Sequence, residues 1–470
     1  MAGMRVPGNL MSIEEQLVTH LREARFEQLP AAAVESAQRE ILWALGTSIA
    51  GSAANGADEV LAFVRQNGGR GESTVWGHGD RVPASLAGFA NGVFAKALEY
   101  EDKLWLDHAH AYAIGTAVVP AAIAVAERVV SGGGTVSGRD LLMAVALATD
   151  IQGRMVRAAL GSITTGWNST YTFSSLGAAM ASIRLQGLPH DQAMNAMGLA
   201  YAQTTGNYQG HREGVLGVRM MMGFGVRNGI TATQLANLGV TGVHKFLTGE
   251  FGIYPLFYRD IPYNLDWLSR DLGSFFTGAD LGFKAYPCCA VIHSVLDAVL
   301  GLGKDMPDAA EVESVMVFGN PRMKICSVPI ELRKHPQCDV DCQFSIPWAV
   351  ACALVDKRVS LSHFTSAALG DARYVALAPR VDIDLQPGRD GVHVEILLKD
   401  GSTLRTAMVT APKGHFENPL STAEVVDRYR DCMQYGPGPL PRERIEAAKD
   451  MVLDLPDLAD ATAIVRALTA

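Results

Sequence analysis

The sequence lacks the features that mark several large classes of protein. It has no basic run and a net charge of -9, whereas phosphate recognition needs concentrated lysine and arginine. No unbroken apolar stretch of about 18 residues occurs, and the first eleven residues contain no apolar signal-peptide core. We therefore expect a cytoplasmic protein that binds neither nucleic acid nor membranes.

Cysteine is scarce, and its spacing matches none of the common cysteine-based sites. The 470 residues include seven cysteines, and an odd number fits reduced thiols better than a disulfide framework. Neither the pair Cys288 and Cys289 nor the pair Cys338 and Cys342 follows an iron–sulfur ligand spacing. Buried structural thiols are the favoured interpretation, and no cofactor is expected.

The sequence is rich in apolar residues with helical spacing. Apolar residues make up 48% of the chain, which is ample for a core, and the length allows two or three domains. Ser12 and Glu15 predict a capping box ahead of the first helix. Helical periodicity follows over residues 31–49, 84–98, 120–130, 138–160, 174–186, 190–205 and 215–238.

The pattern changes after about residue 270. Alternating segments predict strands over residues 312–318, 381–385, 393–398 and 403–410, and Lys399-Asp400-Gly401-Ser402 predicts a hairpin between the last two. Helices are expected over residues 290–302, 346–355 and 362–369. We predict a mainly α protein, with a large all-helical domain over residues 1–270 and a smaller α+β domain over residues 271–412.

One short stretch concentrates chemically active side chains. Lys284, Tyr286 and Pro287 precede a predicted helix, and His293 lies about one turn inside it. Backbone NH groups at a helix N-terminus favour anions, so the stretch could hold a carboxylate while the imidazole moves a proton. The alternative is a solvated lysine and a capped or core histidine.

This stretch resembles the Lys-x-Tyr-Pro-Cys-Cys-x-x-x-His-x-x-x-Asp-Ala signature of the MmgE/PrpD family, which includes dehydratases, decarboxylases and an epimerase of small carboxylic acids. Further family-like segments follow in the family's order at residues 41–51, 74–77, 90–102, 118–122, 344–348, 399–401 and 417–420. The resemblance implies the family's two-domain fold, with residues 413–470 returning as a helical segment to complete the large domain. It also implies a homodimer.

A second group of candidate residues lies between residues 99 and 110. By position, the resemblance places Glu99, Asp102 and Lys103 on the wall of the active site. His108 or His110 would supply an imidazole there, and a pair of surface histidines is the alternative. The spacing of these acidic and histidine side chains matches no standard metal site, so no metal is predicted.

The chain departs from the family pattern at several positions. Asn168 stands where many members have histidine, and Val218 stands where decarboxylase-like members have lysine. The adjacent Arg219 matches, and its guanidinium suits either a carboxylate clamp or a structural salt bridge.

The resemblance implies a cofactor-independent lyase, either a dehydratase or a decarboxylase, that acts on a small di- or tricarboxylic acid. A base would remove the proton next to a carboxylate while cations hold the developing charge. Lys284 would anchor the carboxylate and His293 would move the proton, with the region of Asp102 opposite. Further substrate contacts are expected from Lys103, Glu99, Asn168, Arg219 and Tyr286. An isomerase or epimerase and a non-catalytic binding protein of the same fold remain open.

Overall fold

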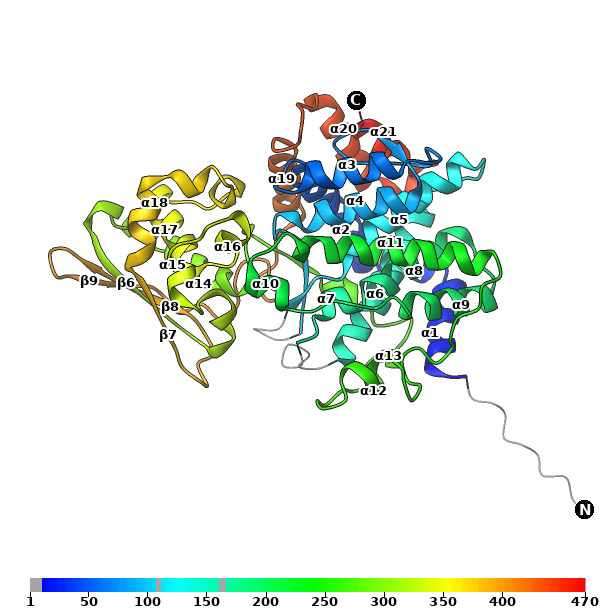
Figure 1. Cartoon of the computed structure of the whole chain (residues 1–470), viewed down its shortest axis with the longest axis horizontal. Helices are drawn as coiled ribbons and strands as arrows, with labels where there is room; N and C mark the ends of the chain where they lie inside the picture. The colour runs from blue at the N-terminus through cyan, green and yellow to red at the C-terminus, as the bar shows by residue number, and fades with distance from the viewer. Residues whose placement is uncertain (1–10, 107–110, 160–165, 470) are drawn as a thin grey trace, which may run out of the picture.

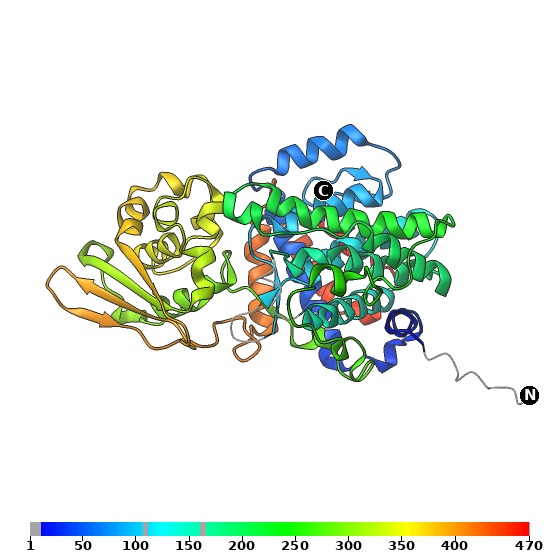
Figure 2. The ribbon, with the colours of Figure 1, turned by 60° about the horizontal axis from the view of Figure 1, so that its bottom comes forward.

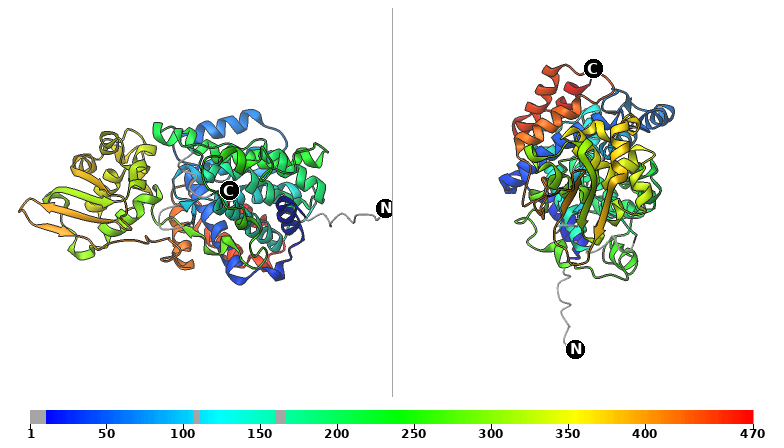
Figure 3. Two further views of the ribbon diagram at one scale, coloured as in Figure 1. Left: turned by 90° about the horizontal axis from the view of Figure 1, so that it is seen from below. Right: turned by 90° about the vertical axis from the view of Figure 1, so that its left-hand side faces the viewer.

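The structure is a computed structural model that describes residues 11–106, 111–159 and 166–469, and it has a two-domain architecture. A large helical part and a smaller part with a four-stranded sheet lie side by side along the longest axis of the molecule (Figures 1 and 3). The predicted mainly α fold is confirmed. The domain limits near residues 270 and 412 stay a prediction.

The large part is built from helices in chain order. Both hydrogen bonds of the predicted capping box form, from Glu15 N to Ser12 Oγ at 3.2 Å and from Ser12 N to Glu15 Oε2 at 2.7 Å. The helices are α1 (Ile13–Glu23), α2 (Ala31–Gly51), α3 (Ala57–Asn67), α4 (Ala84–Ala97), α5 (Gly115–Ser131), α6 (Gly138–Ala158), α7 (Ser169–Thr172), α8 (Ser174–Gln186), α9 (His190–Tyr201), α10 (Gln209–Glu213), α11 (Gly217–Asn237), α12 (Ile253–Phe257) and α13 (Asp266–Ser269).

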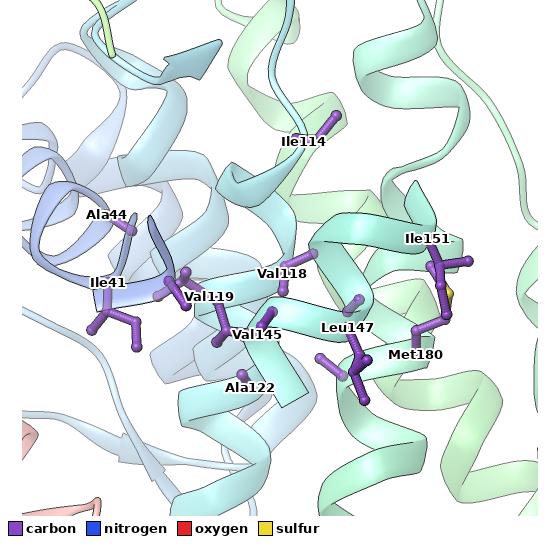
Figure 4. Close-up of a cluster of buried hydrophobic side chains, with 14 of the residues drawn as sticks. Ile41, Ala44, Ile114, Val118, Val119, Ala122, Val145, Leu147, Ile151 and Met180 are labelled. Carbon is purple, nitrogen blue, oxygen red and sulfur yellow. The ribbon is translucent and has the colours of Figure 1, made fainter. Parts of the chain in front are cut away.

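The core of the large part forms where α2, α5, α6 and α8 pack against one another. Figure 4 shows Ile41 of α2, Val118 of α5, Leu147 of α6 and Met180 of α8 in one buried cluster. Small residues permit the close packing of α11 on α8, since a Cβ added to Gly225 would lie 1.9 Å from Ser174 Oγ.

The C-terminal helices pack on the beginning of the chain. Helices α19 (Thr422–Met433) and α20 (Arg442–Leu453) both contact α2, and α21 (Ala463–Leu468) packs on α20. In Figure 1 this orange and red segment lies beside the blue helices of the large part. The C-terminal segment therefore belongs spatially to the helical part.

The smaller part contains a mixed sheet of order β7-β6-β8-β9. Strands β6 (Val312–Gly319) and β7 (Val381–Leu385) are parallel, whereas β8 (His393–Leu398) pairs antiparallel with both β6 and β9 (Thr403–Arg405). The predicted hairpin between β8 and β9 is confirmed. Figure 2 shows this sheet at the end of the smaller part that faces away from the large part.

Helices cover the sheet and connect it to the large part. Helix α14 (Ala290–Leu300) contacts β8, and α17 (Ile346–Asp356) contacts both α14 and β7. The remaining helices are α15 (Ile330–Lys334), α16 (Asp339–Gln343) and α18 (Ala372–Leu377). The helix predicted over residues 362–369 is wrong, because the segment forms two 3₁₀ turns, Leu361–Phe364 and Ala368–Gly370. The first turn is fixed locally by a hydrogen bond from Ser360 N to His363 Nδ1 of 3.0 Å.

Short strands interrupt the helical pattern that the sequence predicts for the large part. Strands β1 (Ser73–Thr74) and β2 (Arg81–Val82) form one antiparallel pair. Strand β3 (Asp102–Trp105) pairs antiparallel with both β4 (Ala111–Tyr112) and β5 (Gly282–Phe283). Within the described ranges, no helix is both long enough and apolar enough to span a membrane.

Candidate active site

The pairing of β3 with β5 brings together two stretches that lie about 180 residues apart in the chain. Asp102 is opposite Phe283 and Lys103 is opposite Gly282, so Lys284 emerges from β5 next to the residues that precede β3. Its ammonium donates hydrogen bonds to the Glu99 backbone oxygen at 2.7 Å and to Glu99 Oε2 at 2.8 Å. It also lies 3.0 Å from Glu101 Oε1.

Two further lysines complete a buried ionic cluster. Lys103 Nζ lies 2.9 Å from Glu101 Oε1, and Lys96 at the end of α4 contacts both Glu99 and Glu101. All five side chains are buried, with Lys103 the most accessible at 7%. Three cations therefore surround two carboxylates, which leaves one positive charge in excess when every group is ionised.

The pKa of one glutamate and of two lysines is lowered in this cluster, for different physical reasons. Burial alone would raise the pKa of Glu101, but the charges of Lys103, Lys284 and Lys96 overcome burial and hold it well below its usual range. Burial lowers the pKa of Lys96 to about 7 although Glu101 opposes the shift. Burial also lowers the pKa of Lys103.

The backbone at Glu99 adopts an unusual conformation that serves this cluster. Its φ is 49°, in the left-handed region that non-glycine residues rarely enter. Such a conformation costs of order 1–3 kcal/mol and persists only where the surroundings enforce it. Here both the carbonyl and the carboxylate of Glu99 accept hydrogen bonds from Lys284.

The ionic cluster forms one wall of a cavity of about 760 Å³, a volume that includes its opening. Residues of both parts line the cavity, as is common for small-molecule sites between domains. The helical part contributes Lys96, Glu99, Glu101, Lys103, Ala111, Tyr112, Asn168, Thr170, Tyr171, Tyr208 and His211, and the smaller part contributes Lys284, Cys289, Ala290, Val291, Arg322, Ile325 and Phe344.

His211 is the histidine that lines this cavity within the described part of the chain. It lies in α10, and its ring packs 5.3 Å from Phe344 and 5.5 Å from Tyr208. Its Nδ1 is buried and has no hydrogen-bond partner among the described residues. Burial, aided by the charge of Lys96, lowers its pKa to about 3, so the imidazole is neutral at physiological pH.

Four of the residues predicted for the site line the cavity: Lys284, Glu99, Lys103 and Asn168. Asn168 caps α7, with its Oδ1 accepting a hydrogen bond of 3.1 Å from Thr170 N. Two further predicted residues, His108 and His110, lie outside the described residues.

Asp102 lies on the opposite face of β3 from the cavity. Successive side chains of a strand alternate between faces, so Glu101 and Lys103 share one face and Asp102 takes the other. Its carboxylate accepts hydrogen bonds from Ile114 N at 2.8 Å, Gly115 N at 2.9 Å and Thr116 Oγ1 at 2.5 Å. It thus caps the N-terminus of α5, which explains why this helix begins five residues before Pro120, the predicted start.

His293 and Tyr286 also lie outside the cavity lining. His293 is inside α14 as predicted, but it is fully buried, and burial lowers its pKa to about 3. Its ring packs against Tyr286 at 5.3 Å, and Tyr286 donates a hydrogen bond of 2.7 Å to Asp297. Both side chains therefore pack beside the turn that presents Lys284, and their role in the site stays a prediction.

Arg219 joins the two parts of the molecule rather than lining the cavity. Its guanidinium donates to the Asn55 backbone oxygen at 2.7 Å and to Asp339 Oδ2 at 3.2 Å. This arrangement matches the structural salt bridge that the sequence left open as the alternative to a carboxylate clamp.

The interpretation of Cys288 and Cys289 as buried structural thiols is wrong for Cys289. Cys288 is buried, but Cys289 is partly exposed and lines the cavity. Sequence reasoning missed Cys289 and His211 as site residues. Cys289 carried a signal, since it lies in the same motif as Lys284, whereas a lone histidine in a glycine-rich segment carries none.

Comparison with known proteins identifies the family. The MmgE/PrpD N-terminal domain model matches residues 15–266, and the MmgE/PrpD C-terminal domain model matches residues 286–454. The chain therefore belongs to the MmgE/PrpD family.

Named relatives align over almost the whole chain. Cis-aconitate decarboxylase of Aspergillus terreus is 24% identical over 94% of this chain and 93% of its own length. Cis-aconitate decarboxylase of Mus musculus is 24% identical over 98% of this chain and 94% of its own. The Homo sapiens protein of the same name is 23% identical over 97% and 94%.

Proposed function

We propose that the protein is a lyase of the decarboxylase or dehydratase type that acts on a small di- or tricarboxylic acid. One observation carries the proposal: three buried lysines face two glutamates at the wall of a cavity, which leaves one positive charge in excess for an anion when all three lysines are protonated. The relatives named as cis-aconitate decarboxylases support the same class.

Lys103 is the group that we expect to hold a substrate carboxylate. It is the most accessible lysine of the cluster, and among the described residues its ammonium donates one side-chain hydrogen bond, to Glu101. The ammonium of Lys284 is already engaged by the backbone oxygen and carboxylate of Glu99 and by the carboxylate of Glu101. Lys284 therefore acts as a fixed positive charge that stabilises the enediolate-like state formed when the proton leaves.

His211 is the group that we expect to move the proton. Its side chain lines the cavity, its buried Nδ1 has no hydrogen-bond partner among the described residues, and no other described imidazole lines the cavity. A neutral imidazole can accept a proton, and the negative charge of a bound polycarboxylate would raise its pKa. Substrate binding would thus activate the base.

Incubation of a panel of di- and tricarboxylic acids in deuterated water tests the proposed reaction class. A lyase releases carbon dioxide or water, and its product carries deuterium only where a proton was returned. Stereochemical scrambling of the α-carbon with neither release would instead identify an isomerase or epimerase and overturn the proposal. Unchanged acids throughout the panel would favour a non-catalytic binding protein.

A matched pair of histidine variants tests the role of His211. His211→Asn should lower kcat by about 10²-fold or more while KM changes little, because the proton acceptor is lost. His335→Asn alters an exposed histidine and should leave both constants unchanged. Equal kinetics in the two variants would remove His211 from the mechanism.

A further inference from the structure

Cys289 is a nucleophilic group in the cavity that the proposed reaction does not use. Of the seven cysteines, it and Cys338 are the two that are partly exposed, and only Cys289 lines the cavity. It directly precedes α14, so its sulfur lies beside the N-terminus of an eleven-residue helix, where a thiolate is favoured.

A second thiol ends the segment that packs against the helix that Cys289 precedes. Cys326 ends the 3₁₀ segment Pro321–Cys326, which packs on α14 and supplies Arg322 and Ile325 to the cavity wall. Cys326 is fully buried, and each of the two thiols shifts the pKa of the other. The partly exposed Cys289 and the buried Cys326 therefore belong to two different elements that pack together.

The surroundings shift the pKa values of the two thiols in opposite directions. The interaction with the Cys326 thiol and the positive charge of Lys284 lower the pKa of Cys289 to about 6, although burial opposes them. Burial raises the pKa of Cys326 well above its usual value. At neutral pH the cavity thus exposes a nucleophile whose neighbour stays protonated.

We propose that Cys289 is an oxidation site, at which hydrogen peroxide forms a sulfenic acid that Cys326 resolves into a Cys289–Cys326 disulfide. The Cys289 sulfur attacks one peroxide oxygen, the O–O bond breaks, and the departing hydroxide takes up a proton to become water. Cys326 then loses its proton and attacks the Cys289 sulfur, and the S–O bond breaks to release a second water. Two thiols lose two electrons and one peroxide gains them.

This disulfide would change the cavity that binds the substrate. It would tie the start of α14 to the segment that carries Arg322 and Ile325, both of which line the cavity. Oxidation should therefore inactivate the enzyme, and a thiol reductant should restore activity. This last expectation rests on the proposed function, whereas formation of the bond does not.

The decisive experiment maps cysteines in the wild-type protein, where no variant has to fold. Iodoacetamide should alkylate Cys289 about tenfold faster than Cys338, whose pKa is raised, and tricarballylate should slow the reaction at Cys289 only. Peptide mapping after peroxide treatment should recover a Cys289–Cys326 disulfide that a thiol reductant removes. Preferential reaction at Cys338, or oxidation of Cys289 without this disulfide, would overturn the proposal.

Two serine variants sharpen the assignment. In Cys326→Ser, no thiol resolves the sulfenic acid of Cys289, so excess peroxide should oxidise it to the sulfinic acid, and a thiol reductant should no longer restore full activity. In Cys338→Ser, the disulfide and its reversal should be as in the wild type. If the disulfide forms in a protein that has no lyase activity, the proposed function alone is wrong. If catalysis is intact and no disulfide forms, the oxidation site alone is wrong.

Discussion

Two buried ionic clusters in this molecule use the same kinds of side chain to different ends. In the pair Asp150–Arg154 of α6, every polar side-chain atom has a partner. Arg154 donates to Asp150 at 2.9 Å and to the backbone oxygens of Arg270, Trp267 and Phe275, while Asp150 accepts a hydrogen bond from Thr277 N. This cluster joins the helical core to the loop that precedes β5 and has nothing left to offer a ligand.

In the ionic cluster at the cavity, by contrast, not every polar side-chain atom has a hydrogen-bond partner among the described residues. Glu101 Oε2 is buried without a hydrogen-bond partner among the described residues, and so is His211 Nδ1 nearby. Buried polar groups are normally satisfied, so unsatisfied groups beside a cavity indicate where a ligand supplies the missing partner. The comparison separates a structural ion pair from a binding site without reference to residue type.

The largest expected effect is on stability, at the structural cluster. Arg154→Met would leave Asp150 buried and unpaired, which should lower the free energy of unfolding by about 3–5 kcal/mol. Chemical denaturation measures this loss. The double variant Asp150→Asn/Arg154→Met should recover part of it, and a single variant as stable as the wild type would contradict the structural assignment.

Removal of a cation from the cluster at the cavity should affect catalysis rather than stability. Lys103→Met should lower kcat/KM by about 10²–10³-fold, which corresponds to about 2.7–4 kcal/mol of transition-state stabilisation. Unfolding should change little, because Lys96 and Lys284 still pair with Glu101. Lys304→Met, at an exposed lysine, is the matched control for steady-state kinetics. A large loss of stability with unchanged kinetics would make this cluster structural as well.

The pH dependence of KM sharpens the comparison further. Lys96 has a pKa of about 7, so its positive charge is present below pH 7 and is lost as the pH rises through that value. Substrate binding should weaken above pH 7, by up to about tenfold per pH unit. Lys96→Arg should move this limb to higher pH, since a guanidinium stays protonated. The measurement belongs in a Cys289→Ser background, because that thiol also titrates, near pH 6.

The smallest expected effect concerns a third buried carboxyl, Glu40. It accepts a hydrogen bond of 2.9 Å from Thr149, and burial together with the charge of Asp102 raises its pKa well above the usual value. The folded state therefore holds this proton more tightly than the unfolded chain, so stability is lost as the pH rises from the unfolded pKa toward the folded one. Glu40→Gln should remove this dependence and raise Tm by about 2–4 °C at alkaline pH. Identical pH profiles of Tm in both proteins would contradict it.

Much of the fold can be predicted from local sequence, and the errors of that prediction have identifiable causes. Periodicity and capping predicted the helices of the core and the hairpin β8–β9, because those signals lie within each element. The start of α5 was predicted too late, because the groups at its N-terminus are capped by Asp102 from another strand. The helix predicted at 362–369 failed where local side-chain hydrogen bonds favour 3₁₀ turns.

The candidate site was predictable only in part. Lys284, Glu99 and Lys103 could be placed by family resemblance, but the face to which Asp102 points depends on strand register, which the short β3 does not reveal in sequence. His211 reaches the cavity through the packing of α10 against Phe344, a contact between distant segments. Such contacts leave no local pattern.

The pairing of β3 with β5 has a consequence for how this protein can be divided. A fragment that stops before residue 282 would retain Glu99, Glu101, Lys96 and Lys103 but lose the strand partner of β3 and the ammonium of Lys284. Two carboxylates would then share two lysines at an open strand edge, and the surplus positive charge would vanish. Two co-expressed halves would have to restore the pairing of β3 with β5 before either could bind an anion. Recovery of ligand binding would therefore report on the pairing of these four residues.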